Sequence, residues 1–119
     1  MKRKRKRIYI SGKISGLSFK EAFAKFDEAK DYFLKLDYDV VNPMTLSHEH
    51  DLSWESYMRE DIKAMMDCDG IALLENYKDS KGALVEKQLA IELNFMVFCQ
   101  FFLESKIDGK SIMVFSRIN

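Results

Sequence analysis

The sequence predicts an α/β protein with three layers, in which a mostly parallel sheet of four or five strands carries helices on both faces. Two observations support this prediction. Short, β-rich apolar runs alternate along the chain with longer runs whose apolar residues recur at helical spacing. One of the short runs, residues 71–74, is apolar throughout, as is typical of strands buried between two helical layers.

The first strand and the first helix have clear signals. Residues 7–11 are β-rich and apolar, and Gly12 follows them directly, so they are expected to form a strand that runs into a loop. Ser18 has the side chain of a helix cap, and Glu21 stands three residues later as in a capping box. Phenylalanines recur behind it at helical spacing, which predicts an amphipathic helix over residues 18–36.

The middle of the chain predicts a strand, a loop, a helix and another strand. Residues 38–41 form the second expected strand, which must end at Asn42-Pro43 because proline cannot donate to a ladder. Residues 44–53 are polar and are expected to form a loop, after which Ser53 caps the second helix. The apolar side of that helix is expected to comprise Trp54, Tyr57, Met58, Ile62, Met65 and Met66, and residues 71–74 then form the third strand.

The last third of the chain predicts a long helix and a final strand. Residues 83–103 are expected to be helical, with a second half that is apolar nearly all round. That surface either packs on the sheet or forms a contact between copies of the chain, as a homodimer or higher homo-oligomer. Residues 108–110 form a turn, and residues 112–115 the last strand. The connectivity suits a small flavodoxin-like or Rossmann-like order, with the first strand between the second and the third.

Size and charge limit the partners. The chain has 119 residues, 47% hydrophobic and 13% aromatic, which suits one domain over residues 8–119. Residues 2–7 are all basic, so residues 1–7 are expected to form a disordered arm, either a solvated terminus or a contact for an anionic surface. Without the arm the chain keeps 13 of its 19 basic side chains against 19 acidic ones, a formal charge of about −6. Nucleic acid is therefore not expected as a partner of the domain.

The expected cellular setting follows from what the sequence lacks. No apolar stretch reaches the ~18 residues that a membrane span needs, and no apolar region follows the basic run as it would in a signal peptide. Cys68 and Cys99 fall inside apolar predicted elements. A reduced, cytoplasmic protein without a membrane segment is expected.

Two glycine-containing turns indicate where a ligand would bind. The segment from Ser80 to Glu86 places a turn and a carboxylate where the third strand gives way to a helix. A similar turn, from Tyr9 to Gly16, follows the first strand. If these strands are parallel neighbours, both turns emerge at the same edge of the sheet and face one bound molecule across a crevice.

Four motifs in order carry a resemblance to a known family. They are Tyr9-Ile-Ser-Gly-Lys-Ile-Ser-Gly16; Val41-Asn42-Pro43; Trp54-x-x-Tyr57-Met58-x-x-Asp61 with Cys68-Asp69-Gly70-Ile71; and Ser80-x-Gly82-Ala83-x-x-Glu86-x-x-x-Ala90. The chain resembles the DUF4406 family, within the nucleoside 2-deoxyribosyltransferase-like superfamily, from residue 8 to about residue 93.

The resemblance implies a site for a nucleoside or nucleotide, without a cofactor or metal. By analogy with the superfamily's enzymes, Glu86 is the nucleophile that attacks the anomeric carbon, Asp61 contacts or protonates the leaving base, and Tyr9 orients the nucleophile. In relatives that hydrolyse deoxynucleoside monophosphates, the matching turns hold the 5′-phosphate. The substrate-binding residues that this implies here are Gly12, Lys13, Gly16, Ser80 and Gly82.

The chemistry is consistent with these residues, because cleavage of an N-glycosidic bond passes through an oxocarbenium-like state that a carboxylate stabilises or captures. Each residue also has a structural interpretation. Glu86 lies in the first turns of a helix and gains from its dipole, Asp61 suits a solvated helix face, and Tyr9 suits a buried strand. Trp54 and Met58 either pack in the core or line the base pocket.

His48 and His50 form an H-x-H pair without further ligands at suitable spacing, so no metal site is predicted. Two main functions remain open at this stage, beside a weaker third option, a nucleic-acid accessory protein that works through residues 2–7. The first is an N-glycosidase or 2-deoxyribosyltransferase, and the second is a non-catalytic nucleotide-binding or sensing module.

Overall fold

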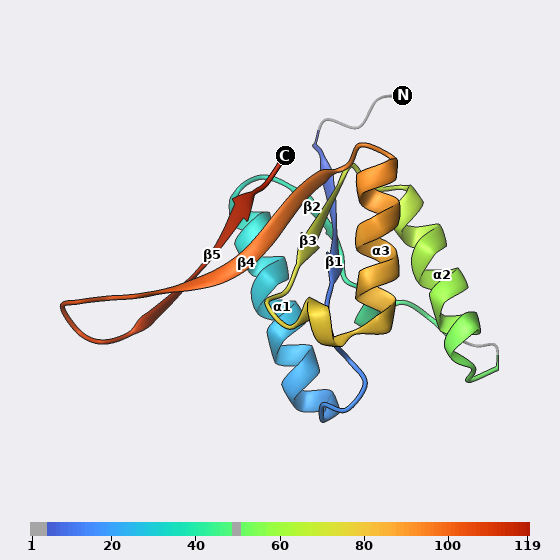
Figure 1. Cartoon of the computed structure of the whole chain (residues 1–119), viewed down its shortest axis with the longest axis horizontal. Helices are drawn as coiled ribbons and strands as arrows, with labels where there is room; N and C mark the ends of the chain where they lie inside the picture. Colours follow the sequence, from blue (N-terminus) through green and yellow to red (C-terminus); the bar gives the residue numbers. More distant parts are fainter. Residues whose placement is uncertain (1–4, 49–50) are drawn as a thin grey trace.

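Five strands form one sheet in the order β2-β1-β3-β4-β5. The computed structural model describes residues 5–48 and 51–119 (Figure 1). The strands are β1 (Arg7–Ser11), β2 (Asp39–Val41), β3 (Gly70–Leu73), β4 (Met96–Glu104) and β5 (Ser111–Arg117). β1 pairs in parallel with β2 and β3, and β3 pairs in parallel with β4, whereas β5 is antiparallel to β4. The predicted α/β class and the position of β1 between β2 and β3 are confirmed.

Helices cover both faces of the sheet, as Figure 1 shows. Helix α1 (Phe19–Lys35) lies on one side, and helices α2 (Trp54–Met66) and α3 (Lys81–Glu92) lie on the other. Successive residues of β1 serve the two cores in turn: Ile8 and Ile10 pack toward α1, whereas Tyr9 belongs to the core beneath α2 and α3. The side chain of Tyr9 therefore points into the layer that carries the candidate site.

The predicted helix starts are confirmed by their caps. The Ser18 side chain accepts a hydrogen bond from the Glu21 amide, and the Ser53 side chain accepts one from the Ser56 amide. Each bond satisfies one of the amides that the first helical turn leaves without a partner. Two short 3-10 helices, η1 (Pro43–Thr45) and η2 (Tyr77–Asp79), shape the loops after β2 and β3.

The predicted long helix over residues 83–103 is wrong in its second half. Helix α3 ends at Glu92, and Asn94 takes a left-handed conformation with a φ of 58°. The chain then re-enters the sheet as β4, where Val97 pairs with Ile71 and is almost completely buried. An apolar run has no polar face, so its period cannot distinguish a helix from a strand. Here pairing between β3 and β5 favours the strand.

The apolar residues that were expected to mediate an oligomer contact therefore lie in a β-hairpin and not in a helix. β4 pairs with β3 only as far as Cys99, but it pairs with β5 from Phe98 to Glu104. The outer part of the hairpin extends beyond the helices (Figure 1). It carries exposed apolar side chains, among them Phe101, Leu103 and Ile112.

The basic run at the start of the chain partly belongs to the fold. β1 begins at Arg7, and the Asp39 amide donates to the Lys6 carbonyl. The Arg5 guanidinium lies 3.9 Å from the Asp37 carboxylate and 4.0 Å from that of Asp39. The expected boundary after residue 7 is therefore too late, and residues 1–4 of the expected arm lie outside the described residues.

Among the described residues, no helix combines the length and the apolar character required to cross a bilayer.

Candidate functional site

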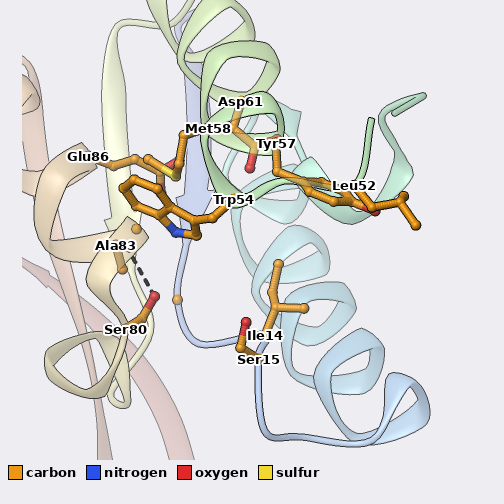
Figure 2. A pocket seen from close by; sticks show the side chains of 12 residues that line it. Ile14, Ser15, Leu52, Trp54, Tyr57, Met58, Asp61, Ser80, Ala83 and Glu86 are labelled. Atoms are coloured by element: carbon orange, nitrogen blue, oxygen red, sulfur yellow. Dashed lines mark hydrogen bonds between the residues drawn. The ribbon is translucent and has the colours of Figure 1, made fainter. Parts of the chain in front are cut away.

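A cleft of about 410 Å³ lies where β1 and β3 end. Its walls come from three segments: the loop after β1, the approach to α2 with its first turns, and the start of α3. Figure 2 shows Trp54, Met58 and Asp61 from α2 beside Glu86 from α3, with Ile14 and Ser15 below them. The carboxyl ends of parallel strands are where open α/β sheets place their ligand sites, and this volume suits a small molecule.

Glu86 is a buried carboxylate whose two oxygens are both hydrogen-bonded. It is only 5% exposed, yet it belongs to the cleft wall. The Tyr9 hydroxyl donates to Glu86 Oε2 at 2.6 Å, and the Ser11 hydroxyl donates to Oε1 at 2.7 Å. Tyr9 and Ser11 are alternate residues of β1, so both side chains leave the same face of the sheet. Two hydroxyls from one strand thus hold both oxygens of the carboxylate.

Burial changes the acidity of both partners. Loss of hydration raises the pKa of Glu86 from 4.5 to about 7, the hydrogen bonds from Tyr9 and Ser11 act in the opposite direction, and the charge of Asp61 adds to the increase. Burial, followed by the neighbouring charges of Glu86 and Asp61, raises the pKa of Tyr9 well above its usual 10. Tyr9 therefore remains a protonated donor while Glu86 changes its charge near neutral pH.

Asp61 also lines the cleft, and its partner is a histidine. His48 Nε2 lies 3.0 Å from Asp61 Oδ1. The centroid of the His48 ring is 4.6 Å from that of Tyr57, which is also part of the cleft wall. In residues 5–48 and 51–119 no group of three or more histidine, cysteine or acidic side chains could hold a metal ion. His50, the other member of the H-x-H pair, lies outside the described residues.

The second glycine turn begins α3 at the cleft wall. Ser80 caps this helix, because its hydroxyl oxygen accepts from the Ala83 amide at 3.1 Å. A Cβ at Gly82 would lie 2.9 Å from Met58 Sδ, so the glycine lets α3 approach α2 closely. Ser80 and Gly82, two of the expected substrate-binding residues, both line the cleft.

Trp54 and Met58 serve the cleft as well as the packing of the two helices. Both line the cleft, and the Lys81 ammonium sits over the Trp54 ring, 4.0 Å from its centroid. With Leu52 and Tyr57 they form an apolar and aromatic wall. Trp54 and Met58 therefore combine packing between the helices with a place in the cleft wall.

The first glycine turn contributes Gly12, Ile14 and Ser15 to the cleft. A Cβ at Gly12 would lie 2.6 to 2.8 Å from the side chain of Leu74, so no larger residue fits without a shift. Lys13 and Gly16 are not in the cleft wall, although they belong to the same turn.

The Lys13 side chain folds back over Gly16, whose φ is +86°: a Cβ at Gly16 would lie 3.8 Å from the Lys13 ammonium. The Lys13 amide donates to Asn76 Oδ1 at 3.0 Å, which joins the first turn to the loop after β3. This places the ammonium beside the turn and outside the cleft wall.

The structure thus brings together most of the predicted site residues. Tyr9 donates a hydrogen bond to Glu86, Asp61 lines the same cleft and its charge acts on both, and Gly12, Ser80 and Gly82 form part of the cleft wall. Sequence reasoning missed Ser11 and the pairing of His48 with Asp61. The two-residue period of a strand could have indicated Ser11, because it shares a face with Tyr9. No local signal pairs His48 with Asp61, since the contact depends on how a loop returns to α2.

The fold and the site define a small α/β domain with a buried carboxylate at the wall of a ligand-sized cleft. The chain belongs to the family described as Domain of unknown function (DUF4406), whose profile matches residues 6–99. No curated protein matches the chain. The matched segment contains the residues of the cleft and ends within β4, before the outer part of the hairpin.

Proposed function

We propose that the protein cleaves or transfers the N-glycosidic bond of a nucleoside or nucleotide, with Glu86 as the nucleophile at the anomeric carbon. The observation that carries this proposal is the Glu86 carboxylate at the cleft wall, buried and held by the hydroxyls of Tyr9 and Ser11. A carboxylate held in one orientation and largely shielded from water is suited to stabilise or capture an oxocarbenium-like centre. The resemblance to the nucleoside 2-deoxyribosyltransferase-like superfamily supports the same assignment.

The reaction divides between two acidic groups. The Glu86 carboxylate adds to C1′ while the C1′–N bond breaks, and the electron pair of that bond leaves with the base. A proton must reach the base as it departs, and Asp61 is the second acid at the cleft. Water or a second base then attacks C1′ and frees Glu86, which gives hydrolysis or transfer respectively. Tyr9 and Ser11 keep the nucleophile oriented throughout.

The walls of the cleft suit the two ends of such a substrate. Trp54 and Tyr57 offer aromatic surface to a base, and the glycine turns with Ser80 offer small residues and polar groups to a sugar or its phosphate. Lys13, folded over Gly16 in the first turn, supplies a cation near that end. Neither Cys68 nor Cys99 forms a disulfide, which suits a reduced cytoplasmic setting, and that setting is part of this proposal.

Chromatographic detection of free base, after incubation with a panel of deoxynucleosides, ribonucleosides and their 5′-monophosphates, tests the proposal. The wild-type protein should release base from at least one compound, and Glu86→Gln should lower kcat by at least about 10²-fold because the nucleophile is lost. Ser47→Ala, at an exposed position outside the cleft, is the matched control and should retain the wild-type rate.

Binding without cleavage would favour the alternative, a nucleotide-binding or sensing module. Trp54 is the only tryptophan of the chain and lines the cleft, so its fluorescence reports occupancy directly. If ligands quench this fluorescence but no base is released by fresh protein at any pH between 5 and 9, the catalytic proposal is overturned and the binding module remains.

A further inference from the structure

The second carboxylate of the cleft is tied to a histidine from a different segment. His48 Nε2 and Asp61 Oδ1 are 3.0 Å apart, and the two side chains are only 15% and 14% exposed. His48 belongs to the loop after β2 and η1, whereas Asp61 lies on α2. The contact therefore joins this loop to the helix that lines the cleft, in a largely enclosed setting where a hydrogen bond between ionisable groups is strong.

The imidazole ring is held on a second side by Tyr57. The ring centroids are 4.6 Å apart with an interplanar angle of 41°. Tyr57 and Asp61 stand four residues apart on α2 and therefore share one face of that helix. Both line the cleft but His48 does not, so His48 acts on a ligand in the cleft through side chains that it contacts, and Asp61 is the acidic one.

We propose that His48 is a positioning residue for Asp61, which orients the Asp61 carboxyl group toward the cleft and resupplies the proton that this group gives to the departing base. This inference rests on the proposed function. As the C1′–N bond breaks and its electron pair leaves with the base, imidazolium His48 gives its Nε2 proton to Asp61 Oδ1 and the carboxyl group gives one proton to the base nitrogen. Asp61 is then ionised and His48 is neutral. The water or base that later attacks C1′ returns one proton to the pair.

The arrangement also resolves a conflict between the two acids. Glu86 must be ionised to attack, yet the negative charge of Asp61 opposes its ionisation. His48 Nε2 lies 3.0 Å from Asp61 Oδ1, so a proton shared between the two side chains offsets that charge and stays within reach of the second acid. One pair of side chains can thus hold a proton for the base without adding net negative charge near the nucleophile.

Two substrates with different leaving groups separate this role from a merely structural one. The first is 2′-deoxyguanosine, whose base must be protonated to leave, and the second is N7-methyl-2′-deoxyguanosine, whose base leaves as a neutral molecule without a proton. Both are offered as nucleosides and as 5′-monophosphates. His48→Ala and His48→Gln should lower kcat for the first substrate by about 10²-fold, the effect of a lost proton donor, and should largely retain the rate on the second.

The two variants also distinguish orientation of Asp61 from proton supply to it. In His48→Gln the side-chain amide can still donate to Asp61 but carries no mobile proton, so recovery of the rate by this variant alone would assign His48 to orientation and overturn proton supply. Equal losses on both substrates, or no loss on either, would overturn the inference while leaving the proposed function intact. A wild-type protein that releases base from no compound of the nucleoside and nucleotide panel would overturn the proposed function, and this inference with it.

A spectroscopic measurement tests the contact without any activity. In ¹⁵N spectra, His48 of the wild-type protein should carry a proton on Nε2, because Asp61 accepts a hydrogen bond there. Asp61→Asn should change the ring-nitrogen signals of His48, while Ser47→Ala, next to it on the exposed surface, should not. Unchanged His48 signals in Asp61→Asn would contradict the pairing.

Discussion

At the scale of single residues, two opposing effects meet on the carboxyl group of Glu86. Burial favours the neutral acid, whereas the hydroxyls of Tyr9 and Ser11 stabilise the charged form. Burial is the larger effect, and it brings the pKa to about 7. The protein therefore keeps a carboxylate that is partly protonated at neutral pH, which makes both its reactivity and its cost to stability dependent on pH.

The pH dependence of base release should follow Glu86. Because the nucleophile must be ionised, the acid limb of kcat/KM is expected to rise as the pH increases through about 7. Ser11→Ala removes a hydrogen bond to the charged form, so it should raise the pKa of Glu86 and move the acid limb to higher pH. Steady-state rates between pH 5 and 9 measure this, and Ser15→Ala, a cleft serine that makes no hydrogen bond to Glu86, should leave the position of the limb unchanged.

The same group should make the fold less stable as the pH rises. A carboxyl group whose pKa is higher in the folded than in the unfolded chain adds stability that is fully present below about 4.5 and is lost as the pH rises through about 7. As the pH rises across that window, the unfolding free energy of the wild-type protein should fall by about 3 kcal/mol more than that of Glu86→Gln. Urea unfolding at pH 4.5 and pH 8 measures the difference, and parallel pH profiles for the two proteins would contradict it.

At the scale of elements, two strand-to-loop junctions build the site. β1 supplies Tyr9 and Ser11 to hold the nucleophile and then turns at Gly12, while the turn after η2 starts α3 and carries Glu86. Both junctions were predictable, because glycine, a capping serine and strand alternation are local signals. The end of α3 was not predictable in this way: residues 93–103 are apolar nearly all round, and neighbouring strands decided their conformation.

Gly12→Ala should damage the first of these junctions. A Cβ at residue 12 would meet Leu74 Cβ at 2.8 Å, an atom that cannot rotate away, so the turn must move. We expect a loss of about 1 to 3 kcal/mol in unfolding free energy, together with weaker ligand quenching of Trp54 fluorescence. Gly82→Ala is the matched comparison: its Cβ would meet the flexible Met58 Sδ at 2.9 Å, so it should cost less. Equal costs would contradict this account of the packing.

At the scale of the whole molecule, the outer part of the hairpin of β4 and β5 exposes an apolar face on which a second copy of the chain could pack. The register pairs Phe101 with Val114 and Leu103 with Ile112, and directly paired residues share a face. These four apolar side chains thus form one face of the outer hairpin, which neither α2 nor α3 covers in Figure 1. A two-stranded ribbon is marginal by itself in water, so contact with a second copy of the chain would stabilise it.

Self-association is accordingly expected to depend on this face. Replacing Leu103 by Lys and Ile112 by Glu removes its apolar centre but keeps a cross-strand pair of opposite charge, so the hairpin itself should persist. Sedimentation velocity should show a dimer or higher oligomer for the wild-type protein and a monomer for the double variant. Ile107→Ser, at the fully exposed tip outside both strands, is the control. A monomeric wild-type protein at millimolar concentration would contradict the expectation.

By itself, the sequence determined the α/β class, the helix starts at Ser18 and Ser53, the strand order around β1, and the two turns at the rim of the cleft. These features depend on local chemistry: the spacing of apolar residues, hydroxyl caps and glycine conformations. Only the tertiary structure decided that residues 96–104 form a strand, that Ser11 joins Tyr9 on Glu86, and that His48 pairs with Asp61. Each of these requires segments distant along the chain to meet, and their burial and hydrogen bonds exist only once the layers have packed.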